Sequence, residues 1–384
     1  MPNTGLADLS NATLVFAIVL YALAMLAYAC DFAFGKRQNA AAGTAAVRRE
    51  PELAAARVGA GVGAGNAFPA DPGDPTELAD LTGSAEPPDE GSADDGQAGT
   101  GNPTATGSRA AAVTLPEPAP MAVRTSPWPQ GPWLRSAFLL TCAGLVLHAA
   151  SVASRGLSEH RVPWGNMYEF IAAITCAVVL VYVLAAIRFR AYYLGLFVMV
   201  TVVLALAVDI LVIYIPAGSL VPALQSYWIA IHVTAMIVAI GTYVFGAVVT
   251  VLYLLADRYE RRVAAGQPSS AAGIMERLPA SSVLDKLAYR AILFAFPAWT
   301  FAVIAGAIWA DHAWGRYWGW DPKETWSFIT WLVYAAFLHA RATAGWRGRR
   351  AALIQMVGFA CLIFNLIGVN LWVHGLHSYA GLSG

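Results

Sequence analysis

The sequence is poor in charge and lacks the residue patterns of several large protein classes. Only 12% of its 384 residues are charged and the formal net charge is zero, so no basic surface points to a nucleic-acid partner. Its four cysteines lie in apolar runs without a Cys-x-x-Cys pair, which excludes a zinc knuckle and a thioredoxin-like redox motif. No Ser-His-Asp set or nucleotide fingerprint argues for hydrolysis or ATP use.

Long apolar runs dominate what is present. Hydrophobic residues make up 58% of the chain, the mean hydropathy is +0.56, and runs of ~20 residues recur. The sequence therefore predicts an all-α polytopic membrane protein with about eight transmembrane helices. Their expected positions are residues 14–34, 136–153, 167–187, 192–215, 228–255, 291–310, 325–342 and 352–373.

Composition divides the chain into three parts. No lysine or arginine precedes the first apolar run, so residues 1–35 are predicted to be a retained transmembrane helix rather than a cleaved signal peptide. Residues 36–132 are rich in Ala, Gly, Pro, Asp and Glu, and we expect a disordered linker. Residues 133–384 form a predicted seven-helix domain.

The basic residues predict the orientation in the membrane. Of 24 lysines and arginines, all but four lie in the linker or in loops on its side. Cytoplasmic loops carry such an excess. The linker is therefore expected in the cytoplasm. Both termini and the segment 311–326 are expected on the outer side.

Aromatic residues crowd into the outward segment. Residues 314–326 read WGRYWGWDPKETW and include Trp314, Trp318 and Trp320. One interpretation is an aromatic belt at headgroup level. A large planar apolar ligand is the other, because indoles supply wide contact area at low entropy cost.

The acidic residues of this segment match a helix start. Asp321 is placed as an N-cap, with proline at the first helical position and Glu324 as its capping-box partner. Asn166 repeats the cap before another predicted helix, with Glu169 three residues later. Such caps would fix the turns that aim neighbouring side chains.

Two of the seven histidines are expected at the outer surface beside the tryptophans. His232 lies near the outer start of its span, and His377 follows the last span. Two imidazoles beside an aromatic platform are typical of a bis-histidine haem pocket. His374 competes with His377 for this role.

His148 and His339 lie inside predicted spans, where an ionisable group is a candidate functional residue. At ~1.5 Å per residue their depths differ, so they are not expected to bind one iron. His339 would then take its second ligand from elsewhere, including another subunit. His148 is either a haem ligand or a structural residue bonded to a neighbouring carbonyl.

At these residues the sequence resembles a known family. Trp314-Gly-x-x-Trp318-x-Trp320-Asp321-x-x-Glu324 matches the tryptophan-rich WWD signature of haem-handling membrane proteins. The ending Gly375-Leu-His377-Ser-Tyr-Ala is similar to that of the CcsA (ResC) proteins of System II cytochrome c biogenesis. The resemblance begins near residue 136 and does not cover the linker.

The resemblance implies a function and a set of site residues. CcsA works with a CcsB (ResB) partner to move haem b outward and attach it to apocytochrome c. By resemblance, His232 and His377 ligate the outer haem iron, and His339 ligates a transmembrane haem with a partner histidine. Trp314, Trp318, Trp320, Asp321 and Glu324 would complete the cofactor-binding set.

The expected function is thus a haem-presenting subunit of holocytochrome c synthase in a bacterial plasma membrane. The Cys-x-x-Cys-His pattern is absent, so the chain itself is not a c-type cytochrome. Two alternatives stay open. One is a b-type electron-transfer protein, and the other is a haem exporter without ligation activity.

Overall fold

The computed structural model describes residues 3–34, 128–216, 218, 224–267, 272–343, 345–373 and 375–377. Almost all of the predicted linker therefore lies outside the described residues. So does His374. The division of the chain at residues 35 and 132 stays a prediction.

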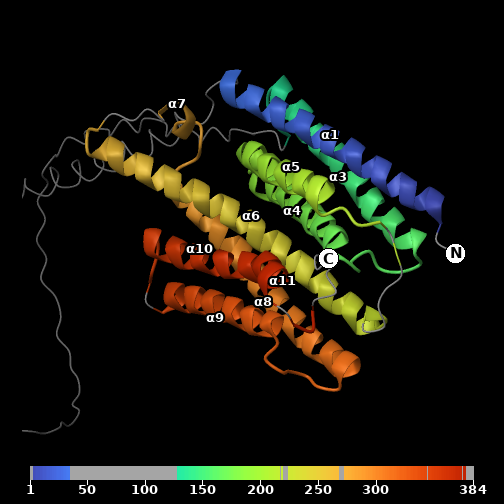
Figure 1. Cartoon of the computed structure of the whole chain (residues 1–384). Coiled ribbons are helices and arrows are strands. Elements are labelled where there is room, and N and C mark those ends of the chain that lie inside the picture. Colours follow the sequence, from blue (N-terminus) through green and yellow to red (C-terminus); the bar gives the residue numbers. More distant parts are fainter. Residues whose placement is uncertain are drawn as a thin grey trace, which may run out of the picture. The chain divides into compact units, whose positions relative to one another are not determined.

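The described chain is all α-helical, as predicted (Figure 1). Within the described ranges, seven helices are long and apolar enough to cross a membrane. The long helices are α1 (Thr4–Phe34), α3 (Pro132–Ser158), α4 (Met167–Phe189), α5 (Gly195–Val212), α6 (Tyr227–Ala264), α8 (Ser281–Trp314), α9 (Pro322–Ala342) and α10 (Arg349–Ile363). Shorter elements are η1 (Tyr192–Leu194), α7 (Ala272–Met275), the π-helix η3 (Phe364–Gly368) and α11 (Val369–Trp372).

Helix α9 corresponds to the predicted span 325–342, and it is not among those seven. Its 21 residues would reach about 31 Å, close to the thickness of a bilayer core. Helix α9 is thus long enough to cross a membrane. Its polar first turn lowers its mean hydropathy. It packs against both α8 and α10 (Figure 1). It is therefore an integral part of the helical bundle.

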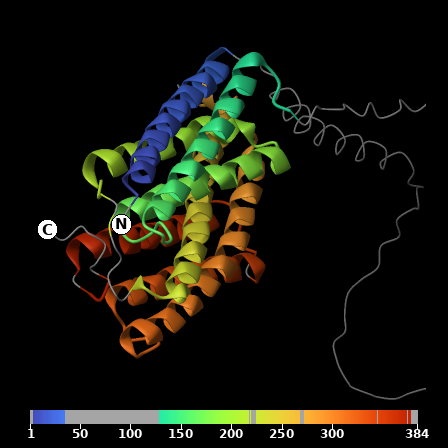
Figure 2. The same ribbon diagram turned by 90° about the vertical axis from the view of Figure 1, so that its right-hand side faces the viewer.

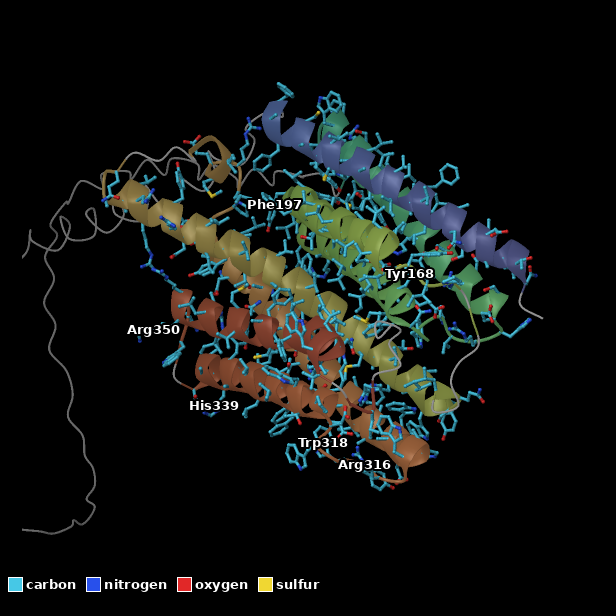
Figure 3. The ribbon with its side chains drawn as sticks, viewed as in Figure 1. Tyr168, Phe197, Arg316, Trp318, His339 and Arg350 are labelled. Atoms are coloured by element: carbon cyan, nitrogen blue, oxygen red, sulfur yellow. The ribbon has the colours of Figure 1, made fainter. Side chains whose placement is uncertain are left out.

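The basic loops meet at one end of the bundle, which we call the basic end. Arg277 donates to the Ala33 carbonyl at 3.0 Å, joining the start of α8 to the end of α1. Arg341 pairs with Asp285 at 2.8 Å, joining α9 to α8. Figure 3 shows His339 and Arg350 at this end and Trp318 and Arg316 away from it. The opposite end, where α3, α8 and α11 stop, is called the pocket end.

Helix α1 packs along α3, in the same compact unit as the other described helices (Figure 2). Ser10 donates to the Ser151 carbonyl at 2.9 Å near the pocket end. Gly144 lets the Tyr21 ring approach α3, because a Cβ there would lie 2.6 Å from the ring. The first span is therefore built into the bundle rather than held apart.

We expect Gly144→Val to destabilise the α1–α3 contact by about 1–3 kcal/mol, because added carbons overpack a filled interface. Thermal unfolding of the detergent-solubilised protein measures the change. Ala143→Val is the matched control, since Ala143 is exposed. Equal melting temperatures for the two variants would show that Tyr21 does not rely on this glycine.

Candidate haem-binding pocket

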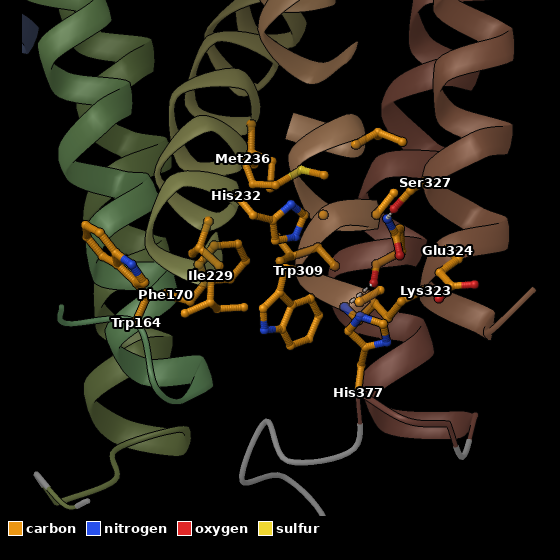
Figure 4. Close-up of a pocket in the computed structure, with 18 of the residues that line it drawn as sticks. Trp164, Phe170, Ile229, His232, Met236, Trp309, Lys323, Glu324, Ser327 and His377 are labelled. Carbon is orange, nitrogen blue, oxygen red and sulfur yellow. Dashed lines mark hydrogen bonds between the residues drawn. The ribbon is translucent and has the colours of Figure 1, made fainter. Parts of the chain in front are cut away.

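A partly open pocket lies at the pocket end, among α4, α6, α8, α9 and the last helical turns of the chain (Figure 4). It encloses about 1130 Å³ of unfilled space, including its mouth. Its walls are mostly apolar, and a few polar groups converge on it, as is typical of cofactor sites. Predicted site residues that line it are His232, Trp314, Trp318, Glu324 and His377.

His232 enters the pocket from the first turns of α6 and is anchored on α8. Its Nδ1 lies 2.7 Å from the Ala302 carbonyl oxygen, which can only accept a hydrogen bond. The ring fits against α8 because residue 306 is glycine. A Cβ on Gly306 would lie 2.6 Å from the imidazole. The ring of His232 therefore packs directly on the backbone of α8 at Gly306, and this contact sets its position.

His377 reaches the same pocket from the C-terminal segment. Its Nδ1 lies 2.7 Å from Oδ2 of Asp321, and the Leu376 amide donates to Oδ1 at 2.7 Å. Gly375 permits this approach, since a Cβ there would lie 2.7 Å from Oδ1. The cap of α9 thus also holds the segment that carries His377.

The two anchors select the same tautomer in both imidazoles. A carbonyl or carboxylate acceptor at Nδ1 requires the proton on Nδ1 in the neutral ring. The lone pair then resides on Nε2 in both His232 and His377. This is the arrangement in which an oriented histidine ligates a metal.

The remaining pocket chemistry fits an iron that brings its own equatorial ligands. Among the described residues, no group of three or more His, Cys, Asp or Glu side chains could hold a bare metal ion. Two histidines alone are too few for a structural zinc site. They suffice for the axial positions of a haem.

Trp309 lies against both imidazoles and was missed by the sequence analysis. Its ring is nearly parallel to that of His232, with centroids 6.1 Å apart, and its centroid is 5.7 Å from that of His377. Trp314 packs edge-on against it at 4.7 Å. Trp309 lies inside an apolar span, five residues before Trp314 and outside its motif, so the sequence offered no signal for it.

The predicted tryptophan platform is divided. Trp314 and Trp318 line the pocket, whereas Trp320 does not and is 65% exposed. Trp320 has a φ of 58°, a left-handed conformation that is uncommon for a bulky residue. Its ring packs edge-on against Trp318, with centroids 5.8 Å apart, and against Phe328 at 6.1 Å. The structure thus places Trp320 outside the pocket.

The loop before α9 is fixed by the predicted capping box, which is confirmed. The Glu324 carboxylate accepts from the Gly319 and Asp321 amides, at 2.8 and 3.1 Å. Arg316 contacts the same carboxylate at 3.3 Å. One carboxylate therefore holds the whole turn that carries Trp318.

A second carboxylate organises the opposite wall, where Asn166 caps α4 as predicted. Glu169 is buried and accepts from Arg155 at 3.2 Å and from Arg161 at 2.7 Å. It also accepts from the Gly165 amide at 2.8 Å. The pocket-lining segment 164–167 is thereby tied to the end of α3.

The pKa of Asp321 follows from its partners. Burial alone raises the pKa of the Asp321 carboxyl. Hydrogen bonds from His377 and from the amides of Leu376 and Lys323 outweigh burial and hold this pKa below its usual range. A lowered carboxyl pKa stabilises the fold fully above the unfolded value of about 3.9, and the effect is lost as pH falls through the folded value. The tether on His377 is therefore intact at neutral pH.

His339 and His148 do not share a site. His339 is exposed on α9 toward the basic end (Figure 3). His148 is fully buried in α3, with Nδ1 3.4 Å from the Tyr21 hydroxyl of α1. One imidazole therefore lies buried between α1 and α3, whereas the other lies on the surface of α9.

Comparison with known proteins agrees with this geometry. A family model described as "Cytochrome C assembly protein" matches residues 164–377, which include both pocket walls and both pocket histidines. The fold and the pocket thus define a multi-pass membrane protein of the cytochrome c assembly class.

Similar curated proteins narrow the class. "Cytochrome c biogenesis protein CcsA" of Guillardia theta is 35% identical over 248 residues, covering 60% of this chain and 81% of its own. The protein of the same name in Gloeobacter violaceus is 34% identical over 293 residues, covering 64% and 85%. That of Chlamydomonas reinhardtii is 44% identical over 163 residues, covering 42% and 43%. The chain belongs to the CcsA family, as its motifs predicted, and has a role in cytochrome c maturation.

We expect Asp321→Ala to release His377 and to change its tautomer, because the Nδ1 proton loses its acceptor. Nitrogen NMR of ¹⁵N-histidine-labelled protein measures the tautomer ratio, which should shift toward the Nε2-protonated form that dominates in water. Asp257→Ala is the control, since Asp257 pairs with Arg261 at the basic end. A His377 signal that is the same in both variants would contradict the assignment.

Proposed function

We propose that this protein presents haem for attachment to apocytochrome c, as one subunit of a cytochrome c synthase. The observation that supports this is the convergence of His232 and His377 on one mostly apolar pocket, each anchored through Nδ1 by an acceptor from another part of the chain. The haem, taken to be haem b, would be gripped at its iron by these two imidazoles.

The residues of the pocket would act by positioning. Haem contributes the vinyl groups that form thioether bonds with the thiols of a Cys-x-x-Cys-His segment. Trp309, Trp314 and Trp318 offer flat surfaces that exclude water from the bound ring. Holding the reactants in register accounts for much of the acceleration in such a reaction. The incoming histidine would replace one of the two pocket imidazoles.

His339 is proposed as the ligand of a second, transmembrane haem. It lies on an exposed face of α9 and far along that helix from the capping box. An exposed histidine needs a second ligand from another chain, and a CcsB-type protein is the proposed source. We propose that the pocket end faces outside a bacterial plasma membrane, because most arginines of the described residues lie at the basic end and basic loops favour the cytoplasm.

The electron-transfer alternative needs two bis-histidine pairs stacked within one chain. His148 faces α1 while His339 is exposed on α9, so the described residues do not supply the second pair. The exporter alternative uses the same pocket but lacks the final step, in which thioether bonds form between haem and apocytochrome c.

We expect His232→Ala or His377→Ala to abolish covalent cytochrome formation, with partial rescue by added imidazole. The assay is co-expression with a CcsB-type partner and an apocytochrome, followed by haem staining of a denaturing gel. His312→Ala is the matched control, because His312 is an exposed pocket-end histidine whose Nδ1 contacts its own helix at the Ile308 carbonyl. Wild-type staining in both pocket variants would refute the axial assignment. Haem that accumulates without stained cytochrome in the wild type would favour the exporter.

His339→Ala should lower the haem that co-purifies with the two-subunit complex, because one axial ligand of the transmembrane haem is removed. Pyridine haemochrome absorbance measures the haem content per complex. His160→Ala, an exposed histidine at the pocket end, serves as control. Unchanged haem content in the His339 variant would remove this residue from the haem path.

A further inference from the structure

One corner of the pocket is polar and is not used by the two histidines. Lys323 and Ser327 line the pocket from α9, and Asn365 lines it from the π-helix η3 (Figure 4). Lys323 and Ser327 are four residues apart and therefore share one face of α9. A charged amine at the wall of an apolar cavity is costly unless it has a partner.

The π-helix organises this corner. The Asn365 carbonyl accepts a hydrogen bond from Lys323 Nζ at 2.6 Å, which holds the amine at the wall. The Asn365 side chain lies 2.9 Å from Ser327 Oγ. Asn365 thus orients both α9 side chains through two different groups. Short π-helical turns often occur at functional sites.

The corner offers more donors than the described residues accept. Lys323 has three N–H donors, and Asn365 takes one of them. When Asn365 Nδ2 donates to Ser327 Oγ, the Ser327 hydroxyl proton is not used in that bond and remains a donor at the pocket wall. If the amide is turned over, the hydroxyl donates to Oδ1 and Nδ2 faces the pocket instead. Either orientation presents a neutral donor beside a cation.

Asn365 also provides an independent sign that the corner is incomplete. It is only 7% exposed, and its Oδ1 has no hydrogen-bond partner among the described residues. Buried amide oxygens are normally satisfied by protein, water or ligand. Oδ1 can only accept, so as placed it needs a donor such as a water bound beside the ligand; with the amide turned over, Nδ2 stands there and can donate to a carboxylate directly.

We propose that Lys323, Ser327 and Asn365 form a carboxylate-binding corner that receives one propionate of the haem. This rests on the proposed haem site and adds a second point of recognition to it. An ammonium beside a hydroxyl or amide donor matches a carboxylate, and charge-assisted hydrogen bonds are the strong ones. With the iron held by the imidazoles and one propionate held here, the ring can no longer rotate about its axial bonds. The corner therefore selects which edge of the ring faces outward.

The test compares iron protoporphyrin IX with its dimethyl ester, in which both carboxylates are neutralised. Absorbance titration of the full-length detergent-solubilised chain gives a Kd for each. Wild type should prefer the diacid by about tenfold or more, the size expected for one charge-assisted hydrogen bond. Lys323→Met should bind the diacid about tenfold more weakly and lose the preference. Lys323→Arg should keep most of it.

Three controls separate the possible causes. Lys286→Met removes an exposed basic-end lysine and should behave as wild type. Iron mesoporphyrin, which retains both propionates but lacks vinyl groups, should still distinguish wild type from Lys323→Met. Ser327→Ala removes only a hydroxyl and should reduce the preference for the diacid. It therefore tests the carboxylate corner if Lys323→Met does not accumulate in the membrane.

The outcomes distinguish this inference from the proposed function. A wild-type preference for the diacid in both Lys323→Met and Ser327→Ala would overturn the carboxylate corner. Absence of haem binding to wild type would overturn the pocket itself. A bis-histidine spectrum that persists in Lys323→Met, together with lost preference, would support the corner and leave the axial ligation intact.

Discussion

The pocket depends on one recurring interaction, an acceptor placed at Nδ1 of an imidazole. For His232 the acceptor is a main-chain carbonyl of α8, and for His377 it is the carboxylate that caps α9. Each contact fixes both the ring orientation and the tautomer. Neither histidine gets its anchor from its own helix or segment, so the site exists only when α6, α8, the cap of α9 and the C-terminal segment are assembled.

The two walls of the pocket are held by the same device. Glu169 and Glu324 each stand in the first turn of a helix, accept from amides of the preceding loop and contact arginine. A carboxylate in the first turn is also stabilised by the positive end of the helix dipole. At the pocket end, where arginine is scarce, three arginines are committed to these two carboxylates. Their charges therefore organise loops rather than form an open basic surface.

Much of this arrangement could be predicted from sequence. Apolar runs gave the helices, the cap motifs gave the starts of α4 and α9, and the motifs gave the family. The pairing of His232 with His377 followed from topology, because alternate loops lie at the same end of a bundle. These inferences use local sequence patterns, or the rule that successive membrane spans run in opposite directions.

Side-chain direction in a loop could not be predicted in the same way. Trp320 stands two residues after Trp318, yet its left-handed backbone turns it out of the pocket. Trp309 lies inside the apolar helix α8 and before the tryptophan-rich motif, so no motif singled it out. Asn365 gains its role from a π-helical turn, and such turns have no reliable sequence signature. Each of these depends on packing between distant segments.

The π-helix between α10 and α11 has a consequence for how insertions and deletions are tolerated. A π-turn holds one residue more than the α-turn it replaces. Removing a single residue from Phe364–Gly368 would turn the π-helix into an ordinary α-turn and leave the faces of the helix beyond it pointing in nearly the same direction. A one-residue deletion in a purely α-helical stretch would instead rotate all later side chains by about 100°. A deletion inside the π-helix would therefore spare the direction of the segment that carries His377 and would alter the turn that carries Asn365.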